Sequence, residues 1–259
     1  MLYFLIFAIF ITITSSNYTI ASFDNHIHLP ITYDIRNIWS QQCPSINMIW
    51  NQEYCGTCSY IASVSTITDR LCIQTNGFIN PILSPMDAIT CCLSCNSTDN
   101  ICTGSYVYMV WQFWLTNGLV INECKPYDIS QTYYTCNNQC DNSTDTSYVK
   151  YYGKYIKEIL YNKVDDIIYE MQKEIYLYGS ITGIMYIYDD LKNYTTGIYE
   201  HNIILNSTGI HAVKIIGWTE DAWIIANSWG ISFGENGFFK IKKGTNECNI
   251  ETRFITGYI

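Results

Sequence analysis

The sequence has few charged residues and few histidines. Charged side chains make up 14% of its 259 residues, whereas roughly 25% is usual in soluble proteins. Acidic residues outnumber basic ones by 23 to 14, and the formal net charge is −9. An acidic surface repels phosphate groups, so we expect neither a nucleic acid nor an anionic membrane as a partner. The sequence has four histidines, so few residues are candidates for a histidine base in catalysis.

The sequence also has no hydrophobic run of membrane-spanning length. The run over residues 2–13 would be about 18 Å long as a helix, against a bilayer core of roughly 30 Å. Small polar residues at 14–16 follow it, so we expect a secretory signal peptide over 1–16 and no membrane span after its removal. The first basic residue is Arg36. The usual basic start of a signal is therefore missing, and an uncleaved anchor or a buried strand remains an alternative.

Cysteine and aromatic residues, in contrast, are abundant. Twelve cysteines are typical of a protein that folds in an oxidising compartment. A hydrophobic content of 48% with 15% aromatic residues excludes disorder. Motifs for N-glycosylation, each weak alone, agree with secretion; they begin at Asn17, Asn96, Asn142, Asn193 and Asn206. We expect a glycoprotein that is secreted, or delivered to a lysosome or vacuole.

The hydrophobic pattern divides the chain into two unlike parts. Helical spacing over 61–71 and 105–116, and a capped start at Ser84, predict helices in the first part. In the second part, an amphipathic helix over 164–177 precedes strand-like runs, which lie at 180–188, 211–218, 222–227 and 237–242. The polar segment 124–148 connects the two parts. The pattern predicts an α+β fold with a cleft between a helical half, about 40–120, and a β half, about 150–245.

The segment Gln52–Ser59 carries two cysteines directly before the first expected helix. Cys55 and Cys58 are compatible with a redox dithiol, with half of a zinc site, or with two disulfide half-cystines. Cys58 begins the helix, where free backbone N–H groups and the positive end of the helix dipole stabilise a thiolate. If Cys58 is a nucleophile, eleven cysteines remain, and the isolated Cys248 is the natural unpaired one.

A thiolate nucleophile needs a base and a group that orients the base. His26 and His28 lie near the expected processing site, and His201 lies in an irregular stretch. His211 opens a strand-like run and is the better candidate. Asn227 follows another such run, so its amide oxygen is suited to hold the imidazole, with Trp229 shielding the hydrogen bond from water.

Together these motifs resemble the papain-like cysteine peptidases, and within them cathepsin B. The resemblance covers residue 29 to the C-terminus. The matching segments contain the Cys-Gly-x-Cys sequence, the His-Ala and Asn-Ser-Trp-Gly motifs, and several flanking stretches; they lie at 29–36, 52–58, 68–73, 90–92, 124–127, 211–212, 227–230 and 236–241.

The resemblance implies a papain-like fold of two subdomains, a helical half and a β-barrel-like half, with a C-terminal tail that returns to the helical half. It implies Cys58 as the nucleophile, His211 as acid and base, Asn227 as the orienting residue and Gln52 as an oxyanion donor. Implied substrate-binding residues are Gly56, Gly104, Ser105, Ala212, Trp229 and Arg253. Implied disulfides are Cys43–Cys72, Cys55–Cys102, Cys91–Cys136, Cys92–Cys95 and Cys124–Cys140. Zinc binding by Cys92, Cys95, Cys136 and Cys140 is the rival interpretation.

Several positions depart from the family pattern. Ser59 stands where a tryptophan is usual, and Ser105 replaces a glycine of the wall that contacts substrate, so it narrows the second subsite. Only eleven residues separate Cys124 from Cys136, and none is histidine. The paired histidines by which cathepsin B holds a substrate carboxylate are therefore missing, which predicts endopeptidase rather than peptidyl-dipeptidase action. Arg253, at the floor of the second subsite, would favour acidic side chains at P2, unless it extends to solvent.

We therefore expect a cysteine endopeptidase of protein or peptide substrates. Its expected organisation is a signal peptide over 1–16, a short residual propeptide over 17–28 and a peptidase domain over 29–259. We expect a monomer that needs no cofactor and no metal and that cystatin-type inhibitors recognise. A catalytically weak or inactive binding protein on the same scaffold is the alternative, and a dithiol oxidoreductase is a more distant one.

Overall fold

The computed structural model describes residues 27–259 except 96–97, 99, 131–134, 142–146 and 162–165. The helices are α1 (Arg36–Trp39), α2 (Cys58–Gln74), α3 (Pro85–Cys91), α4 (Val107–Asn117) and α5 (Ile167–Tyr178), with short 3-10 turns η1 (Pro44–Asn47), η2 (Ile101–Thr103), η4 (Asp189–Asn193) and η5 (Glu247–Asn249). The strands are β1 (Tyr33–Asp34), β2 (Tyr155–Leu160), β3 (Ile181–Ile187), β4 (Ile198–Tyr199), β5 (Gly209–Trp218), β6 (Ala222–Ala226), β7 (Phe238–Lys242) and β8 (Arg253–Tyr258).

The three helices expected in the first part are present. α2 is the central element, and all of its residues from Ser59 to Ile73 are buried. α3 begins where the Ser84 hydroxyl accepts a hydrogen bond from the Asp87 N–H at 3.1 Å, which is the expected N-cap. α4 buries Val107, Val110, Trp111 and Trp114. It ends at Gly118, whose φ of 69° favours glycine.

Seven strands of the second part and β1 of the first part form one eight-stranded sheet. Its strand order is β2-β8-β3-β5-β6-β7-β4, with β1 paired to β5. The expected strands correspond to β3, β5, β6 and β7. Within the described residues the strand path is open, so the expectation of a barrel-like half is wrong in this respect: β2 and β4 lie at the two ends and do not pair with each other.

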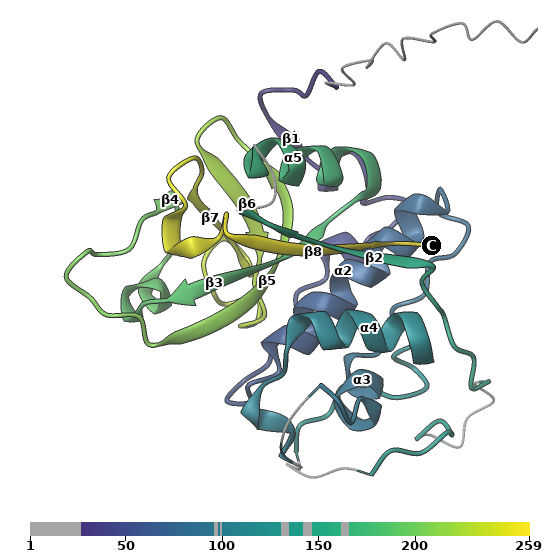
Figure 1. Ribbon diagram of the computed structural model, residues 1–259. Helices are drawn as coiled ribbons and strands as arrows, with labels where there is room; N and C mark the ends of the chain where they lie inside the picture. The colour runs from purple at the N-terminus through teal and green to yellow at the C-terminus, as the bar shows by residue number, and fades with distance from the viewer. Residues whose placement is uncertain (1–26, 96–97, 99, 131–134, 142–146, 162–165) are drawn as a thin grey trace, which may run out of the picture.

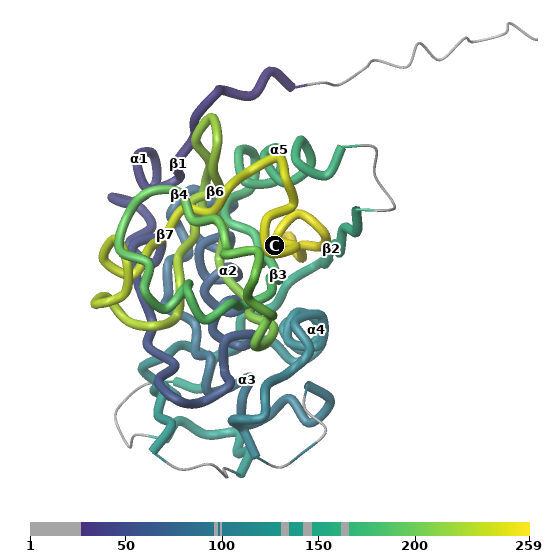
Figure 2. Tube along the Cα trace, turned by 90° about the vertical axis from the view of Figure 1, so that its left-hand side faces the viewer, coloured from purple at the N-terminus to yellow at the C-terminus, as the bar shows by residue number. Residues whose placement is uncertain are grey.

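The two parts share an extended interface. Figure 1 shows β2 and β8 running from the sheet toward α4, and in Figures 1 and 2 α5 and α3 lie at opposite ends of the molecule. The C-terminal Ile259 N–H donates to the Gln74 side chain of α2 at 3.0 Å. The chain end therefore returns to the helical half. No helix in the described part of the chain has the length and hydrophobicity needed to cross a bilayer.

Ten cysteines form disulfides, in the five pairs that the resemblance implies: Cys43–Cys72, Cys55–Cys102, Cys91–Cys136, Cys92–Cys95 and Cys124–Cys140. Cys58 and Cys248 are free. The bridges exclude the zinc interpretation, because all four sulfurs it requires are bonded. They also exclude a Cys55–Cys58 redox pair, because Cys55 is joined to Cys102.

Candidate active site

Cys58 is the first residue of α2, and a tight turn leads into it. The Gly56 N–H donates to the Cys102 carbonyl at 3.1 Å, and the disulfide Cys55–Cys102 closes the same contact. A Cβ atom on Gly56 would lie 2.5 Å from that carbonyl oxygen, so the close approach requires glycine here. The turn therefore places a thiol at the positive end of the central helix.

His211, the third residue of β5, faces Cys58 from the β half. β5 pairs with β3 so that His211 lies opposite Met185, and the imidazole is buried. Burial by itself raises the pKa of Cys58, but the charge of His211, its hydrogen bond and the N–H groups of Ala212 and Ser59 outweigh this and lower that pKa. Burial lowers the pKa of His211, whereas Cys58 and Asn227 raise it more strongly. The result favours a thiolate–imidazolium pair.

Asn227 follows β6 and holds the imidazole from the far side. Its Oδ1 accepts from His211 Nε2 at 2.8 Å and from the Ser228 N–H at 2.9 Å. An amide oxygen only accepts, so Nε2 carries a proton and Nδ1 is the nitrogen left for Cys58. The Trp229 ring lies 5.2 Å from the His211 ring, centre to centre, and covers this side of the site.

Gln52 connects the helical half to the β half at the site. Its Nε2 donates to the Cys55 carbonyl at 3.0 Å, and its Oε1 accepts from the Ser228 hydroxyl at 2.5 Å. The Gln52 backbone N–H donates to the Ser228 carbonyl at 2.8 Å. The amide is held on both sides, and one of its N–H bonds remains for a ligand in the cleft.

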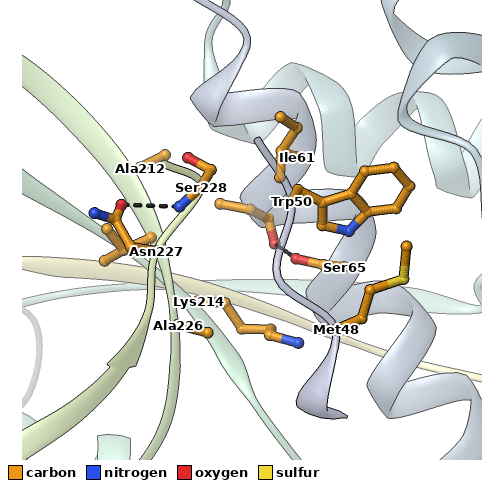
Figure 3. A pocket seen from close by; sticks show the side chains of 11 residues that line it. Met48, Trp50, Ile61, Ser65, Ala212, Lys214, Ala226, Asn227 and Ser228 are labelled. Atoms are coloured by element: carbon orange, nitrogen blue, oxygen red, sulfur yellow. Dashed lines mark hydrogen bonds between the residues drawn. The ribbon is translucent and has the colours of Figure 1, made fainter. Parts of the chain in front are cut away.

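A small cavity of about 10 Å³ lies behind Asn227, between β5, β6 and α2. Figure 3 shows Asn227 and Ser228 on one side of it, Lys214 below, and Trp50 and Met48 opposite. Asn227 Nδ2 is buried and has no hydrogen-bond partner among the described residues. The side chain is therefore held through its oxygen, which is the atom that contacts the imidazole.

The cleft has a volume of about 550 Å³, and Cys58 and His211 lie in its wall. The structure brings the expected binding residues together here: Gln52, Gly56, Gly104, Ser105, Ala212, Trp229 and Arg253 all line it. Among the other residues of the lining are three isoleucines that the sequence did not single out: Ile184, Ile187 and Ile210. Ile210 directly precedes His211 in the chain, and this position beside the expected base was the signal by which the sequence could have identified it as a cleft residue.

Two departures from the family pattern are in contact with each other. The Ser59 and Ser105 hydroxyls lie 2.5 Å apart, and Ser105 also accepts or donates a hydrogen bond with Tyr60, whose pKa burial raises to about 12. Ser59 and Tyr60 belong to the first turn of α2. The two substitutions thus form a direct link between this turn and the cleft wall at Ser105.

Arg253 is the first residue of β8, and its Nε lies 2.6 Å from Oε1 of Glu158 on the neighbouring strand β2. Its side chain is 37% exposed. The residue lines the cleft and also a smaller adjoining groove. The side chain thus contributes to the cleft wall and is also paired and partly solvated, and its preference for acidic P2 side chains stays a prediction.

A free thiol at a helix N-terminus, a buried imidazole beside it and an amide that orients the imidazole are the parts of a cysteine-type hydrolase. Comparison with known proteins gives the same class. The model of the family described as "Papain family cysteine protease" matches residues 29–258, and the chain belongs to this family.

Cathepsin B-like proteins are among its relatives. Cathepsin B-like cysteine proteinase 3 of Caenorhabditis elegans is 38% identical over 88% of this chain and 66% of its own length; the chain thus spans about two thirds of that relative. A cathepsin B-like cysteine proteinase of Schistosoma japonicum is 31% identical over 93% of this chain and 76% of its own length. The solved structure of procathepsin B S9 from Trypanosoma congolense has a TM-score of 0.80 and 28% sequence identity, and the match covers 90% of this chain and 78% of that one.

A more distant structure shows the shared fold alone. It is a cysteine protease of Carica candamarcensis in complex with E-64, with a TM-score of 0.69 and 21% identity over 89% of this chain and 99% of its own.

Proposed function

We propose that this protein is an active cysteine endopeptidase that cleaves protein or peptide substrates through an acyl-enzyme on Cys58. The observation that carries the proposal is the contact between a free thiol of lowered pKa and a buried imidazole of raised pKa. Both groups line one cleft, together with the Gln52 amide. No cofactor or metal takes part in the proposed steps.

The first half of the reaction acylates the enzyme. The Cys58 thiolate attacks the scissile carbonyl carbon, a C–S bond forms, and the carbonyl π electrons move to the oxygen. The free N–H of Gln52 and the Cys58 backbone N–H stabilise this oxyanion, and one such donor is worth about 3–4 kcal/mol in related sites. The C–N bond then breaks, and the proton on His211 Nδ1 passes to the leaving amine.

The second half releases the product. A water molecule transfers a proton to His211 as its oxygen attacks the thioester carbon, and the C–S bond breaks to restore the thiolate and imidazolium. Throughout, Asn227 accepts from Nε2 and keeps Nδ1 directed to the sulfur. Asn227 thus acts through His211, as a positioning residue.

Endopeptidase action follows from the segment between the cysteines of two bridges. Cys91–Cys136 and Cys124–Cys140 hold this segment at both ends. It has no histidine, and its one basic residue, Lys125, is buried and pairs with Asp87, so we propose that it offers no cation to a substrate's terminal carboxylate. We propose an oxidising location, secreted or in a lysosome or vacuole, because five disulfides are stable there. Exposed Asn193 and Asn206 are accessible for glycosylation; the other three motifs and the proposed signal lie outside the described residues.

The test is cleavage of a long internally quenched peptide by the mature protein, with mass analysis of the products. We expect internal cuts, covalent labelling of Cys58 by a peptidyl epoxide, and loss of both in Cys58→Ala. Release of C-terminal dipeptides alone would contradict endopeptidase action. A folded protein that neither cleaves nor reacts would be the inactive binding protein of the alternative hypothesis.

A further inference from the structure

We propose that His201, Glu247 and Cys248 form a binding site for a single zinc-like divalent cation, outside the catalytic cleft. One potential ligand atom from each side chain lies within 4.8 Å of the other two. None of the three lines the cleft. His201 was rejected as a catalytic base and Cys248 is the second free cysteine, so the proposed reaction leaves these groups without a role.

The three side chains already converge on one atom. Glu247 Oε1 accepts from His201 Nδ1 at 2.5 Å and from Cys248 Sγ at 3.2 Å. Tetrahedral zinc, with bonds of about 2.0–2.3 Å, holds its ligand atoms roughly 3.3–3.6 Å apart. For these two pairs of atoms, the change needed for binding is a separation of under about 1 Å. The third pair, His201 Nδ1 and Cys248 Sγ, lies within 4.8 Å and would have to reach the same range.

The donor set selects the class of cation. Imidazole nitrogen, thiolate sulfur and carboxylate oxygen together are typical of zinc, and hard cations such as Mg²⁺ prefer oxygen alone. Three protein ligands leave the fourth position for water. When the metal binds, the Cys248 thiol loses its proton to solvent, and His201 binds through Nδ1 with no proton on that nitrogen. Metal binding is therefore coupled to proton release.

The surrounding residues hold the ligands in place. The His201 ring stacks on Tyr188 with centres 4.1 Å apart, and its backbone N–H donates to the same Glu247 oxygen at 2.9 Å. Cys248 is buried and has a φ of 50°, which is uncommon for a residue other than glycine or asparagine. The fold maintains this unfavourable backbone conformation at a residue whose thiol belongs to the cluster.

The charge nearby also favours a cation. Asp190 interacts electrostatically with Cys248; its carboxylate accepts from the Tyr199 hydroxyl and the Asn202 N–H, each at 2.7 Å. Two nearby lysines are already paired with carboxylates: Lys242, which interacts electrostatically with Glu247, lies 2.7 Å from Glu200, and Lys192 of η4 lies 2.8 Å from Asp189. Negative charge therefore exceeds positive charge around the three ligands.

The site lies next to the substrate-binding wall in the chain. Asn249 follows Cys248 directly, and with Thr252 and Arg253 it lines the groove of about 140 Å³ that adjoins the cleft. His201 follows β4, far from η5 in sequence. A bound cation would therefore tie the segment that leads to Arg253 to the region of β4.

The test uses Cys58→Ala, because the catalytic thiolate and imidazole are themselves able to bind zinc. This protein is titrated with Co²⁺, whose bond to a thiolate gives a near-ultraviolet charge-transfer band, and Zn²⁺ is then added to displace it. We expect one Co²⁺ per chain, displaced by one Zn²⁺. Because the readout is optical in an inactive protein, it is independent of whether the protease function is correct.

Second-site variants in the Cys58→Ala background locate the metal. We expect Cys248→Ser to lose the band and Glu247→Gln to bind at least tenfold more weakly, whereas Glu123→Gln, at an exposed glutamate outside the cluster, binds normally. Thermal unfolding of each variant without metal shows that it is folded. The proposal is overturned if Cys58→Ala shows no band, or if folded Cys248→Ser shows an unchanged band. If Cys248→Ser does not fold, an unchanged Co²⁺ affinity of Glu247→Gln overturns the proposal.

Discussion

At the scale of single residues, the reactivity of Cys58 depends on its surroundings. The same side chain type at Cys248 is buried and contacts Glu247, and burial with that carboxylate raises its pKa. At Cys58, burial also acts to raise the pKa, but His211 and two backbone N–H groups reverse the outcome. Two free thiols in one chain thus differ because one faces a cation and the other faces an anion.

The pH profile follows from this pair. The pKa of Cys58 lies below its ordinary 9.0 and that of His211 above its ordinary 6.5. kcat/KM should therefore rise with pH as the thiol deprotonates, and fall at higher pH as the imidazolium deprotonates. Because the Asn227 hydrogen bond raises the pKa of His211, Asn227→Ala should shift the alkaline limb to lower pH. The measurement is kcat/KM against pH for both proteins; an alkaline limb that does not move would contradict the role of Asn227.

Arg253 carries the prediction on substrate preference. Its guanidinium lines the cleft but shares its charge with Glu158. We expect a preference for Asp or Glu at P2 of about two- to fivefold, because a half-exposed charge pair is worth under about 1 kcal/mol. Glu158→Gln frees the guanidinium and should strengthen the preference, whereas Arg253→Met should abolish it. A P2 library scan measures the preference of the parent protein and of both variants. Equal P2 profiles for Arg253→Met and the parent would show that Arg253 does not set the preference.

At the scale of elements, the turn before α2 determines where the nucleophile lies. The turn is closed by a disulfide and by one backbone hydrogen bond to Cys102, and it leaves no room for a side chain at Gly56. The position of Cys58 is therefore fixed by an element about 45 residues further along the chain rather than by the helix alone.

Gly56→Ala tests this dependence. The new Cβ would lie 2.5 Å from the Cys102 carbonyl oxygen, so the turn must shift, and a displacement near 1 Å lowers kcat/KM by about 10- to 100-fold. The matched control is Gly209→Ala at the start of β5, where nothing lies within 4 Å. It should retain activity. Equal activities of the two folded variants would show that the turn tolerates a side chain.

At the scale of the whole molecule, buried charges of α2 hold the two halves together. Arg70 donates to Glu174 at 3.1 Å, to the Gly257 carbonyl at 2.7 Å and to the Gly179 and Ser180 carbonyls at 3.1 Å each. Asp69 pairs with Lys214 of β5 at 2.8 Å. Each contact joins the central helix α2 either to the β half or to α5, which packs on the β half.

Arg70→Met should destabilise the protein strongly. It removes a charged donor from the buried Glu174 carboxylate, which keeps Lys157 and Tyr258 as partners, and from three backbone carbonyls. Breaking a buried ion pair typically costs about 3–5 kcal/mol of the free energy of unfolding. Lys192→Met is the control, because it removes a solvent-exposed ion pair with Asp189 and should change little. Urea unfolding with the disulfides intact measures both. A loss as small for Arg70→Met as for the control would contradict this account.

Prediction from sequence succeeded where the signal is local and failed where it depends on distant pairing. The helices α2, α3 and α4 follow from spacing and capping residues next to one another in the chain. β2 and β8 were not expected: they pair with each other across nearly a hundred residues, and β2, which is mostly half-buried, lacks a clear alternation. The open sheet was missed for the same reason, since closure depends on which strands are neighbours.

By itself, the sequence determined the family, the secondary structure of the first half and the set of reactive side chains, because motif order and hydrophobic spacing are properties of the linear chain. Only the tertiary structure decided that Ser59 meets Ser105, that Glu158 accompanies Arg253, and that Cys248 joins His201 and Glu247. Those groupings arise because strands and turns far apart in the chain are packed together, and no local pattern records which distant side chains they bring into contact.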